Sequence, residues 1–101
     1  MPPTPDRVTL DAYVVDVLLP DLVGHDRRPS AFLVYLWLWR QAGGPRRGTE
    51  VSLRGIAEGT GLSKRAVQTG LATLERRRLV AIERRGPTAV PVYTVLRPWR
   101  R

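Results

Sequence analysis

The stretch SLRGIAEGTGLSKRAVQTGLATLERRRLV, residues Ser52 to Val80, decides how this chain folds. It predicts a helix, a tight turn and a second helix. Ser52 is a good N-cap, and apolar residues follow it at helical spacing. We expect the first helix to end near Thr60-Gly61, because glycine tolerates the left-handed backbone that ends helices.

The second helix is predicted to bury one face. Ser63 is its N-cap, and Val67, Leu71 and Leu74 follow at positions i, i+4 and i+7. Gly70 lies beside that face, and its small size would let a neighbouring helix approach closely.

The opposite face of this second helix is polar and basic. Long cations and hydrogen-bonding groups can meet phosphates or base edges in a major groove, where glutamine pairs with adenine and arginine with guanine. The alternative interpretation is a solvated helix face. The residues expected on this face are Lys64, Arg65, Gln68, Thr69 and Thr73.

A β-hairpin is predicted after the second helix. The runs Leu79 to Glu83 and Ala89 to Leu96 are rich in β-branched residues, and they flank the turn Arg84-Arg85-Gly86-Pro87-Thr88. Pro91 cannot donate a ladder hydrogen bond, so we expect the returning strand to be an edge strand there. Thr49 to Val51 is a further short β-run that would pair beside this hairpin.

Helix, turn, basic helix and hairpin together resemble the winged helix-turn-helix domain of MarR- and GntR-type bacterial regulators and of phage and plasmid replication proteins. The resemblance covers roughly the C-terminal half of the chain. It implies a mainly α (α+β) fold, with an added N-terminal helix and a C-terminal β-hairpin wing, that binds double-stranded DNA. The shared pattern is met by Ile56, Ala57, Thr60, Gly61, Leu62, Ser63, Val67, Leu71, Leu74, Leu79 and Val80.

Two positions depart from that pattern. Gly70 stands where alanine is common, which weakens the helix by about 1 kcal/mol. Arg78 stands where glycine often ends the recognition helix. Either Arg78 adopts a left-handed backbone, or the helix runs on and enters the wing differently.

The resemblance and the residue types together define a candidate DNA-binding set. Neutralising a phosphate needs a cation, and reading a base needs a side chain with a donor or acceptor at its tip. The set is Ser63, Lys64, Arg65, Gln68, Thr69, Thr73, Arg54, Arg84 and Arg85.

The placement of charge supports a polyanionic partner. The chain of 101 residues has a formal net charge of +8. Residues 1–51 hold six arginines and six acidic residues, whereas residues 52–101 hold eleven cations and three acidic residues. The whole net charge therefore lies in the half that resembles a winged helix, which is the electrostatic footprint of a nucleic-acid-binding surface.

The sequence lacks the residues that several classes of function require. It has no cysteine, no Ser-His-acid arrangement and no phosphate-cradling glycine loop, so we predict no enzyme and no cofactor. His25 could bind a metal together with Asp21 or Asp26, but no second histidine or cysteine exists to complete such a site, and we predict no metal. No apolar run has membrane-spanning length and no signal peptide is evident, so we expect a cytoplasmic protein, associated with a bacterial or phage nucleoid.

The N-terminal half of the sequence fits more than one structure. Val8 to Leu19 fits a helical face and also fits a strand; we favour a helix, with Thr9 as its cap and Pro20 ending or kinking it. Ser30 to Ala42 is apolar nearly all round, so it should be buried nearly all round. The first helix or a second copy of the chain would cover it, and a ligand pocket among its aromatic residues is a weaker alternative.

We expect one domain. It would consist of a loose tail (1–7), N-terminal helices (8–45), the helix-turn-helix with its wing (49–96) and a basic tail (97–101). Trp99 in that tail would either dock on the core or accompany the arginines toward DNA. A homodimer through residues 8–42 and a monomer both remain open.

The function expected from the sequence is sequence-specific binding of double-stranded DNA by a transcriptional regulator or small replication initiator, without a small-molecule effector. The alternatives are a winged-helix module that docks an acidic protein and an RNA-binding protein, the latter disfavoured because no aromatic residues interleave the cations of residues 63–78.

Overall fold

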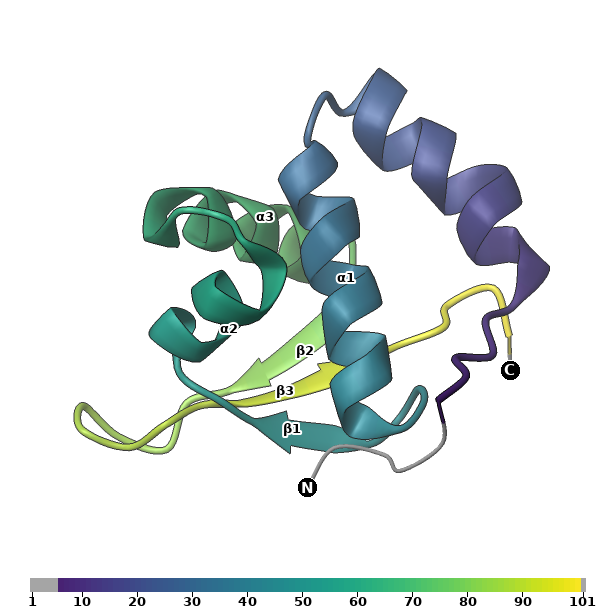
Figure 1. The fold of residues 1–101 in the computed structure, drawn as a ribbon. Helices are drawn as coiled ribbons and strands as arrows, with labels where there is room; N and C mark the ends of the chain where they lie inside the picture. The colour runs from purple at the N-terminus through teal and green to yellow at the C-terminus, as the bar shows by residue number, and fades with distance from the viewer. Residues whose placement is uncertain (1–5, 101) are drawn as a thin grey trace.

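The computed structural model describes residues 6–100, so most of the predicted loose tail and Arg101 lie outside the described residues. Figure 1 shows a three-stranded sheet beneath α1, with α2 and α3 on one side and an N-terminal helix on the other. This is the winged helix-turn-helix fold that the sequence predicts. The elements are the π-helical turns η1 (Val14–Leu18) and η2 (Asp21–His25), α1 (Pro29–Ala42), β1 (Gly48–Glu50), α2 (Leu53–Thr60), α3 (Lys64–Arg76), β2 (Val80–Glu83) and β3 (Val92–Val95).

The helix-turn-helix unit has the predicted caps. The hydroxyl of Ser52 accepts a hydrogen bond from the Gly55 amide at 3.0 Å, and that of Ser63 accepts one from the Ala66 amide at 3.0 Å. Gly61 ends α2 with a φ of 79°, a left-handed conformation that glycine adopts without strain. Local sequence therefore fixes both ends of the turn.

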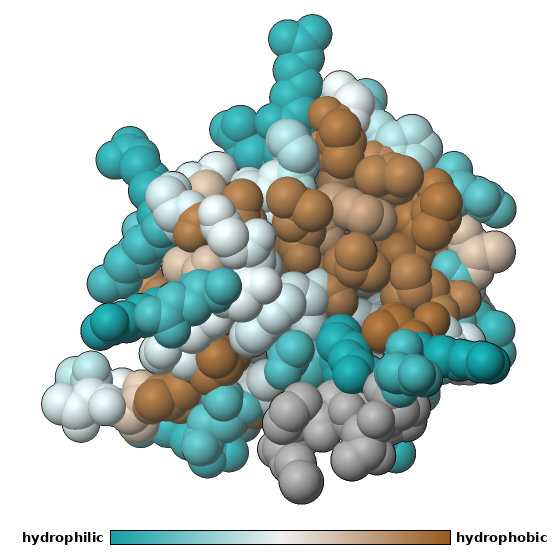
Figure 2. Space-filling view, viewed as in Figure 1, coloured by the Kyte–Doolittle hydropathy of each residue, from teal (hydrophilic) through white to brown (hydrophobic). Residues whose placement is uncertain are grey.

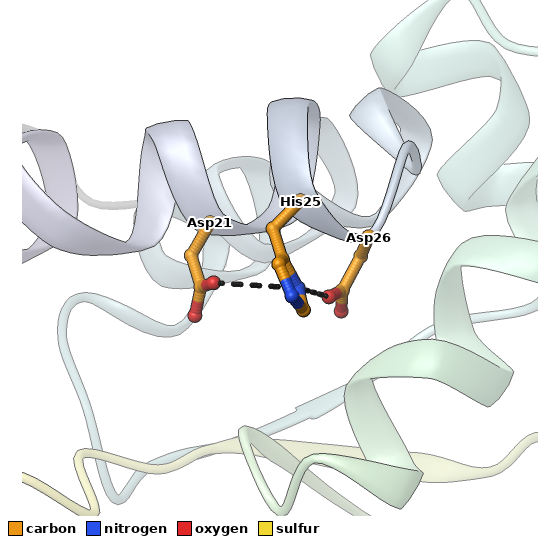
Figure 3. Close-up of side chains that lie close together, drawn as sticks. All are labelled: Asp21, His25 and Asp26. Carbon is orange, nitrogen blue, oxygen red and sulfur yellow. Dashed lines mark hydrogen bonds and ion pairs between the residues drawn. The ribbon is translucent and has the colours of Figure 1, made fainter.

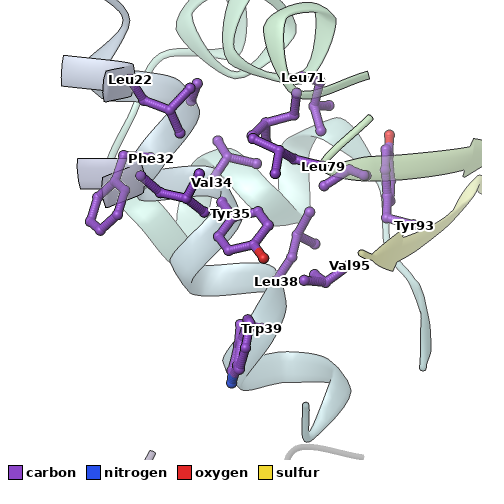
Figure 4. Packing of buried hydrophobic residues seen from close by; sticks show 14 of the residues in the cluster. Leu22, Phe32, Val34, Tyr35, Leu38, Trp39, Leu71, Leu79, Tyr93 and Val95 are labelled. Atoms are coloured by element: carbon purple, nitrogen blue, oxygen red, sulfur yellow. The ribbon is translucent and has the colours of Figure 1, made fainter. Parts of the chain in front are cut away.

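Helix α1 is the centre of the core. Val34, Tyr35 and Leu38 are completely buried, and Figure 4 shows them between the N-terminal helix, α3 and the sheet. The Tyr35 hydroxyl donates to the Leu96 carbonyl at 2.9 Å, which satisfies its polar end. Burial raises the pKa of the Tyr35 phenol, so it stays a donor at ordinary pH.

Gly70 is the point where α3 meets α1. A Cβ built at Gly70 would lie 3.0 Å from the carbonyl carbon and oxygen of Ser30 and 3.1 Å from the Ala31 nitrogen. Those atoms are backbone, which cannot rotate away as a side chain can. The departure from alanine at this position thus has a structural reason, because α1 needs the space.

The structure at the end of α3 shows which backbone conformation Arg78 adopts, at the second position that departs from the winged-helix pattern. Arg78 has a φ of 58°, so it takes the left-handed backbone that glycine often supplies. The Leu79 amide then donates to the Leu74 carbonyl at 2.8 Å, which closes the helix and turns the chain into β2.

The sheet has the order β1-β3-β2, with both pairs antiparallel. Tyr93 in β3 lies opposite Thr49 on one side and Ile82 on the other. The prediction that the returning strand is an edge at Pro91 is therefore wrong. Pro91 lies just before β3, outside the paired residues, so the central strand loses no ladder hydrogen bond.

The N-terminal segment is helical rather than extended. Val14, Leu18 and Leu22 recur at every fourth residue and are buried, a spacing that places them on one face of the helix. Pro20 does not end this helix, because its φ of −65° and ψ of −28° fit helical geometry. Thr9 is not its cap: helix begins only after Asp11, and the Thr9 carbonyl accepts from the Trp39 indole at 2.9 Å.

The C-terminal tail docks on this N-terminal segment. The Trp99 ring stacks on Tyr13 with centroids 4.5 Å apart, and its indole N–H donates to the Asp11 carboxylate at 3.0 Å. Of the two arrangements that the sequence left open for Trp99, the structure therefore has the docked one.

An ion-pair network joins the N-terminal helix to the C-terminal end of α3. Arg77 donates from Nη2 to Asp21 and from Nη1 to Asp26, the latter at 2.7 Å. Figure 3 shows His25 between the same two aspartates, with its Nδ1 3.0 Å from Asp26. Hydrogen bonds from His25 and Arg77 lower the pKa of Asp26, and the hydrogen bonds that Arg77 donates to both aspartates raise the pKa of Arg77.

Gly70→Ala should lower the free energy of unfolding by about 1 kcal/mol, because overpacking against α1, which costs about 1–3 kcal/mol, outweighs the higher helix propensity of alanine, which contributes about 1 kcal/mol. Urea unfolding followed by circular dichroism measures this. The matched control is Gly24→Ala, where a Cβ meets nothing within 4 Å and should stabilise the protein. An equal gain in both variants would show that α1 does not need the space.

Arg77→Gln should lower the free energy of unfolding by about 1–2 kcal/mol near neutral pH. The pKa of Asp26 is lower in the folded protein than in the unfolded chain, where it is about 3.9. The stabilisation that the ionised Asp26 provides is therefore fully present above the unfolded pKa and is lost as the pH falls through the folded pKa. The difference from the wild type should therefore shrink at about pH 3.

Urea titrations at both pH values measure that difference, with Arg76→Gln as the control because Arg76 is exposed and makes no ion pair within the described residues. A destabilisation by Arg77→Gln that is the same at both pH values would mean that Arg77 acts through packing rather than charge.

Candidate nucleic-acid interface

The outer face of α3 is polar and exposed. Lys64, Arg65, Gln68 and Thr69 are all exposed, as is the capping residue Ser63. The apolar residues on the inner face of the same helix are at most 5% exposed; they are Val67, Leu71 and Leu74. The helix thus buries its apolar side and presents hydrogen-bonding side chains from its first two turns.

Thr73 is the exception. It is 2% exposed, so the prediction that it lies on the outer face is wrong. Thr73 follows Gly70 by three residues on the same flank of α3, and α1 approaches that flank closely. Thr73 therefore belongs to the packed side of α3 rather than to its exposed face.

Sequence reasoning missed two residues of the exposed face. Ala72 and Arg76 follow Arg65 by seven and eleven residues, which places them along the same side of the helix, and both are exposed. The helical spacing alone would have identified them. Ala72 keeps the middle of the face flat, and Arg76 adds a cation near its end.

Arg54 lies in the first turn of α2. Its side chain is 84% exposed and pairs with Glu58, one turn later, at 3.2 Å. An exposed pair of this kind contributes little to stability. Its guanidinium can therefore exchange the carboxylate for another anion at small cost.

The wing loop, residues 84–91, extends beyond β2 and β3 on the side of the molecule where α2 and α3 lie (Figure 1). Both of its arginines are paired with carboxylates in this structure. Arg84 lies 3.4 Å from Glu75 of α3, and Arg85 lies 3.3 Å from Glu50 and 3.7 Å from Glu83. These three glutamates are neighbours of the wing that sequence reasoning did not include, because two of them come from other elements.

The structure brings the metal candidates of the sequence together. One ligand atom each of Asp21, His25 and Asp26 lies within 4.8 Å of the others (Figure 3). The second oxygen of each carboxylate bonds Arg77. The cation that this cluster binds here is thus a guanidinium, and its effect is to position α3 against the N-terminal helix.

Among the described residues, no helix combines the length and apolar character needed to cross a membrane. A family model for a helix-turn-helix domain matches residues 28–80, which span α1 through the start of β2. No curated protein and no solved structure matches the chain. The matched range covers more than half of the sequence and includes both capped helices, and such domains are typically non-enzymatic and bind DNA. The chain therefore belongs to the helix-turn-helix domain family.

Proposed function

We propose that this protein binds double-stranded DNA in a sequence-specific manner, as a transcriptional regulator or a small replication initiator. The observation that carries the proposal is the exposed face of α3, where Lys64, Arg65, Gln68 and Thr69 project from its first two turns. Helix-turn-helix proteins read base edges from this end of the second helix. The resemblance to MarR- and GntR-type regulators and to replication proteins favours these two roles, which would place the protein in the cytoplasm with the nucleoid.

The composition of the face supports base reading as well as phosphate binding. Arginine can bind guanine through two hydrogen bonds and glutamine can bind adenine in the same way, so Arg65 and Gln68 are the proposed reading residues. Exposed Ala72 between Arg65 and Arg76 leaves room for the helix to lie deep in a groove. Ser63, Lys64 and Thr69 are proposed to contact phosphates or thymine methyl groups.

The wing and the start of α2 are proposed to contact the phosphate backbone. Arg84 and Arg85 have side chains that are 64% and 50% exposed, and their carboxylate pairs lie at 3.3 Å or more. Such pairs are weak in water, so phosphates can replace the carboxylates. Arg54 is proposed to act in the same way from α2.

The second candidate function is a winged-helix module that binds an acidic protein. The same basic face would serve, because fold alone does not decide function. RNA binding has less support, since aromatic side chains for base stacking are absent from α3 and the wing. Binding to random duplex DNA that weakens steeply with salt would separate DNA binding from protein docking.

Arg65→Ala or Gln68→Ala should lower the binding free energy by about 1–3 kcal/mol on the best site selected from random duplexes and by much less on random DNA.

Neutralising Arg84 and Arg85 together should weaken binding to all duplexes alike and reduce the salt slope by about one unit per lost phosphate contact. Fluorescence anisotropy across a salt series measures both effects.

Arg27→Ala is the matched control, because Arg27 is exposed in the loop between η2 and α1 and belongs neither to the exposed face of α3 nor to the wing. Equal losses on selected and random DNA would show that Arg65 and Gln68 contact only phosphate. No loss in any of these variants would remove α3 and the wing from the interface and favour the protein-docking module.

We propose further that the protein acts as a homodimer formed through residues 8–42. Figure 2 shows apolar side chains gathered over α1 and the N-terminal helix. Val15, Val23 and Leu33 are 49%, 38% and 43% exposed, and a groove of about 280 Å³ continues the apolar surface along Leu36 and Trp37. A second copy of the chain would cover this surface and give a two-fold arrangement that suits an inverted repeat.

Val15→Glu together with Leu33→Glu should convert a dimer into a monomer, as measured by light scattering at micromolar concentration. Both residues are exposed within one chain, so the charges should not disturb its fold. Val14 and Leu18 are unsuitable for this test because they are buried in the core of a single chain. A monomer mass for the wild type, with selected DNA sites that lack two-fold symmetry, would contradict the dimer.

A further inference from the structure

A basic cleft opens at the C-terminal end of α1. It has a volume of about 510 Å³ and lies between residues 7–11 and the loop formed by residues 43–47. The Arg46 amide donates to the Val95 carbonyl at 2.7 Å, which ties this loop to the last residue of β3. The wing loop precedes the first residue of β3. The cleft therefore lies at the opposite end of the sheet from the wing.

The lining of the cleft is strongly positive. It contains the guanidinium groups of Arg7, Arg40, Arg47 and Arg97, against the single carboxylate of Asp11. A concave site lined by one sign of charge concentrates the field and attracts counter-ions. The cleft is therefore a place where an anion would be more stable than in bulk water.

Asp11 offsets only part of this positive charge, because its carboxylate is already paired with one of the lining arginines. Both of its oxygens accept from Arg97, at 3.1 and 3.2 Å, and one accepts from the Trp99 indole at 3.0 Å. Burial raises the pKa of Asp11, but the hydrogen bonds from Trp99 and Arg97 lower it by more. The pairing leaves Arg7 and Arg47 in the lining without this carboxylate.

Two arginines of the lining are available to a ligand. Within the residues that the structure describes, Arg7 and Arg47 make no hydrogen bond or ion pair. The buried Nε of Arg97 has no hydrogen-bond partner there either, a state that is uncommon in folded proteins and costs free energy.

We propose that this cleft binds a small organic di- or trianion, carrying phosphate or carboxylate groups, through Arg7, Arg47 and Arg97. The planar guanidinium fork binds either group through two parallel hydrogen bonds. Val8, Trp39 and Pro45 form apolar parts of the wall, which suit an organic body. The volume lies within the range of small-molecule sites, roughly 300–1,000 Å³.

This inference goes beyond DNA binding and differs from the expectation that no small molecule binds. DNA phosphates offer the same chemistry, so the test must separate the two sources. An NMR titration of the full chain with pyrophosphate, and separately with citrate, at constant ionic strength does so. Saturating shifts should appear in the backbone amides of residues 7–11 and 43–48.

Arg47→Ala should weaken pyrophosphate binding about tenfold, the effect of losing one charged hydrogen-bonding group, and should leave affinity for duplex DNA unchanged. Arg7→Ala is the second variant, and the amide spectrum of each variant shows whether it folds. Arg27→Ala is the control and should not change anion affinity, because Arg27 lies just before the N-terminal end of α1 whereas the cleft lies at its C-terminal end.

Three results would overturn the proposal. Shifts that do not saturate, or that spread equally over α3 and the wing loop, would indicate an adventitious ion only. Equal weakening by Arg27→Ala would indicate general attraction to a basic protein. A loss of DNA affinity in Arg47→Ala that parallels the loss of pyrophosphate affinity would make the cleft part of the DNA interface.

Discussion

The close packing of α3 on the first turn of α1 is the contact on which the rest of the structure depends. It requires a glycine, because a Cβ at position 70 would meet the backbone of Ser30 at 3.0 Å. Once this contact forms, Val67, Leu71 and Leu74 are buried with the core of α1. The polar face of α3 then has to point outward. The exposure of the proposed reading residues is thus a consequence of how their apolar neighbours pack.

The cations of the chain divide into groups by what they contact. Arg77 and Arg97 are largely buried and bridge distant segments through aspartates, so they stabilise the fold. Arg54, Arg84 and Arg85 are exposed and weakly paired. Lys64, Arg65 and Arg76 are exposed on α3 and make no ion pair within the described part of the chain. The net charge of +8 already subtracts these carboxylates, and the location of each ion pair shows which cations are left without a carboxylate.

Two features connect the wing to α3: the backbone turn at Arg78 and an ion pair between Arg84 and Glu75. Arg78 takes a left-handed backbone and directs the chain from α3 into β2, and Arg84 then reaches back to Glu75 on α3. The contact between wing and helix is an exposed ion pair, which water screens strongly. This arrangement keeps the arginine near the position where a groove-bound α3 would bring a phosphate, without a large cost for releasing the carboxylate.

The sequence by itself determined the helix-turn-helix and its boundaries, because helix caps act between residues two to four positions apart. Ser52, Gly61 and Ser63 perform the roles that their residue types indicate. Most of the outer face of α3 was predictable for the same reason, since helical spacing is local. The hairpin was also evident, although its strands are shorter than expected.

Tertiary structure alone decided what depends on residues far apart in the chain. Thr73 is buried although its local spacing places it with the polar residues, and β3 is central because β1 pairs with it from across the sequence. The segment Val8 to Leu19 fitted two periodicities, and packing against α1 selected the helix that buries Val14 and Leu18. The bond between Arg77 and Asp26 spans 51 positions. No local pattern encodes such contacts, because their free energy exists only once the core has brought both partners together.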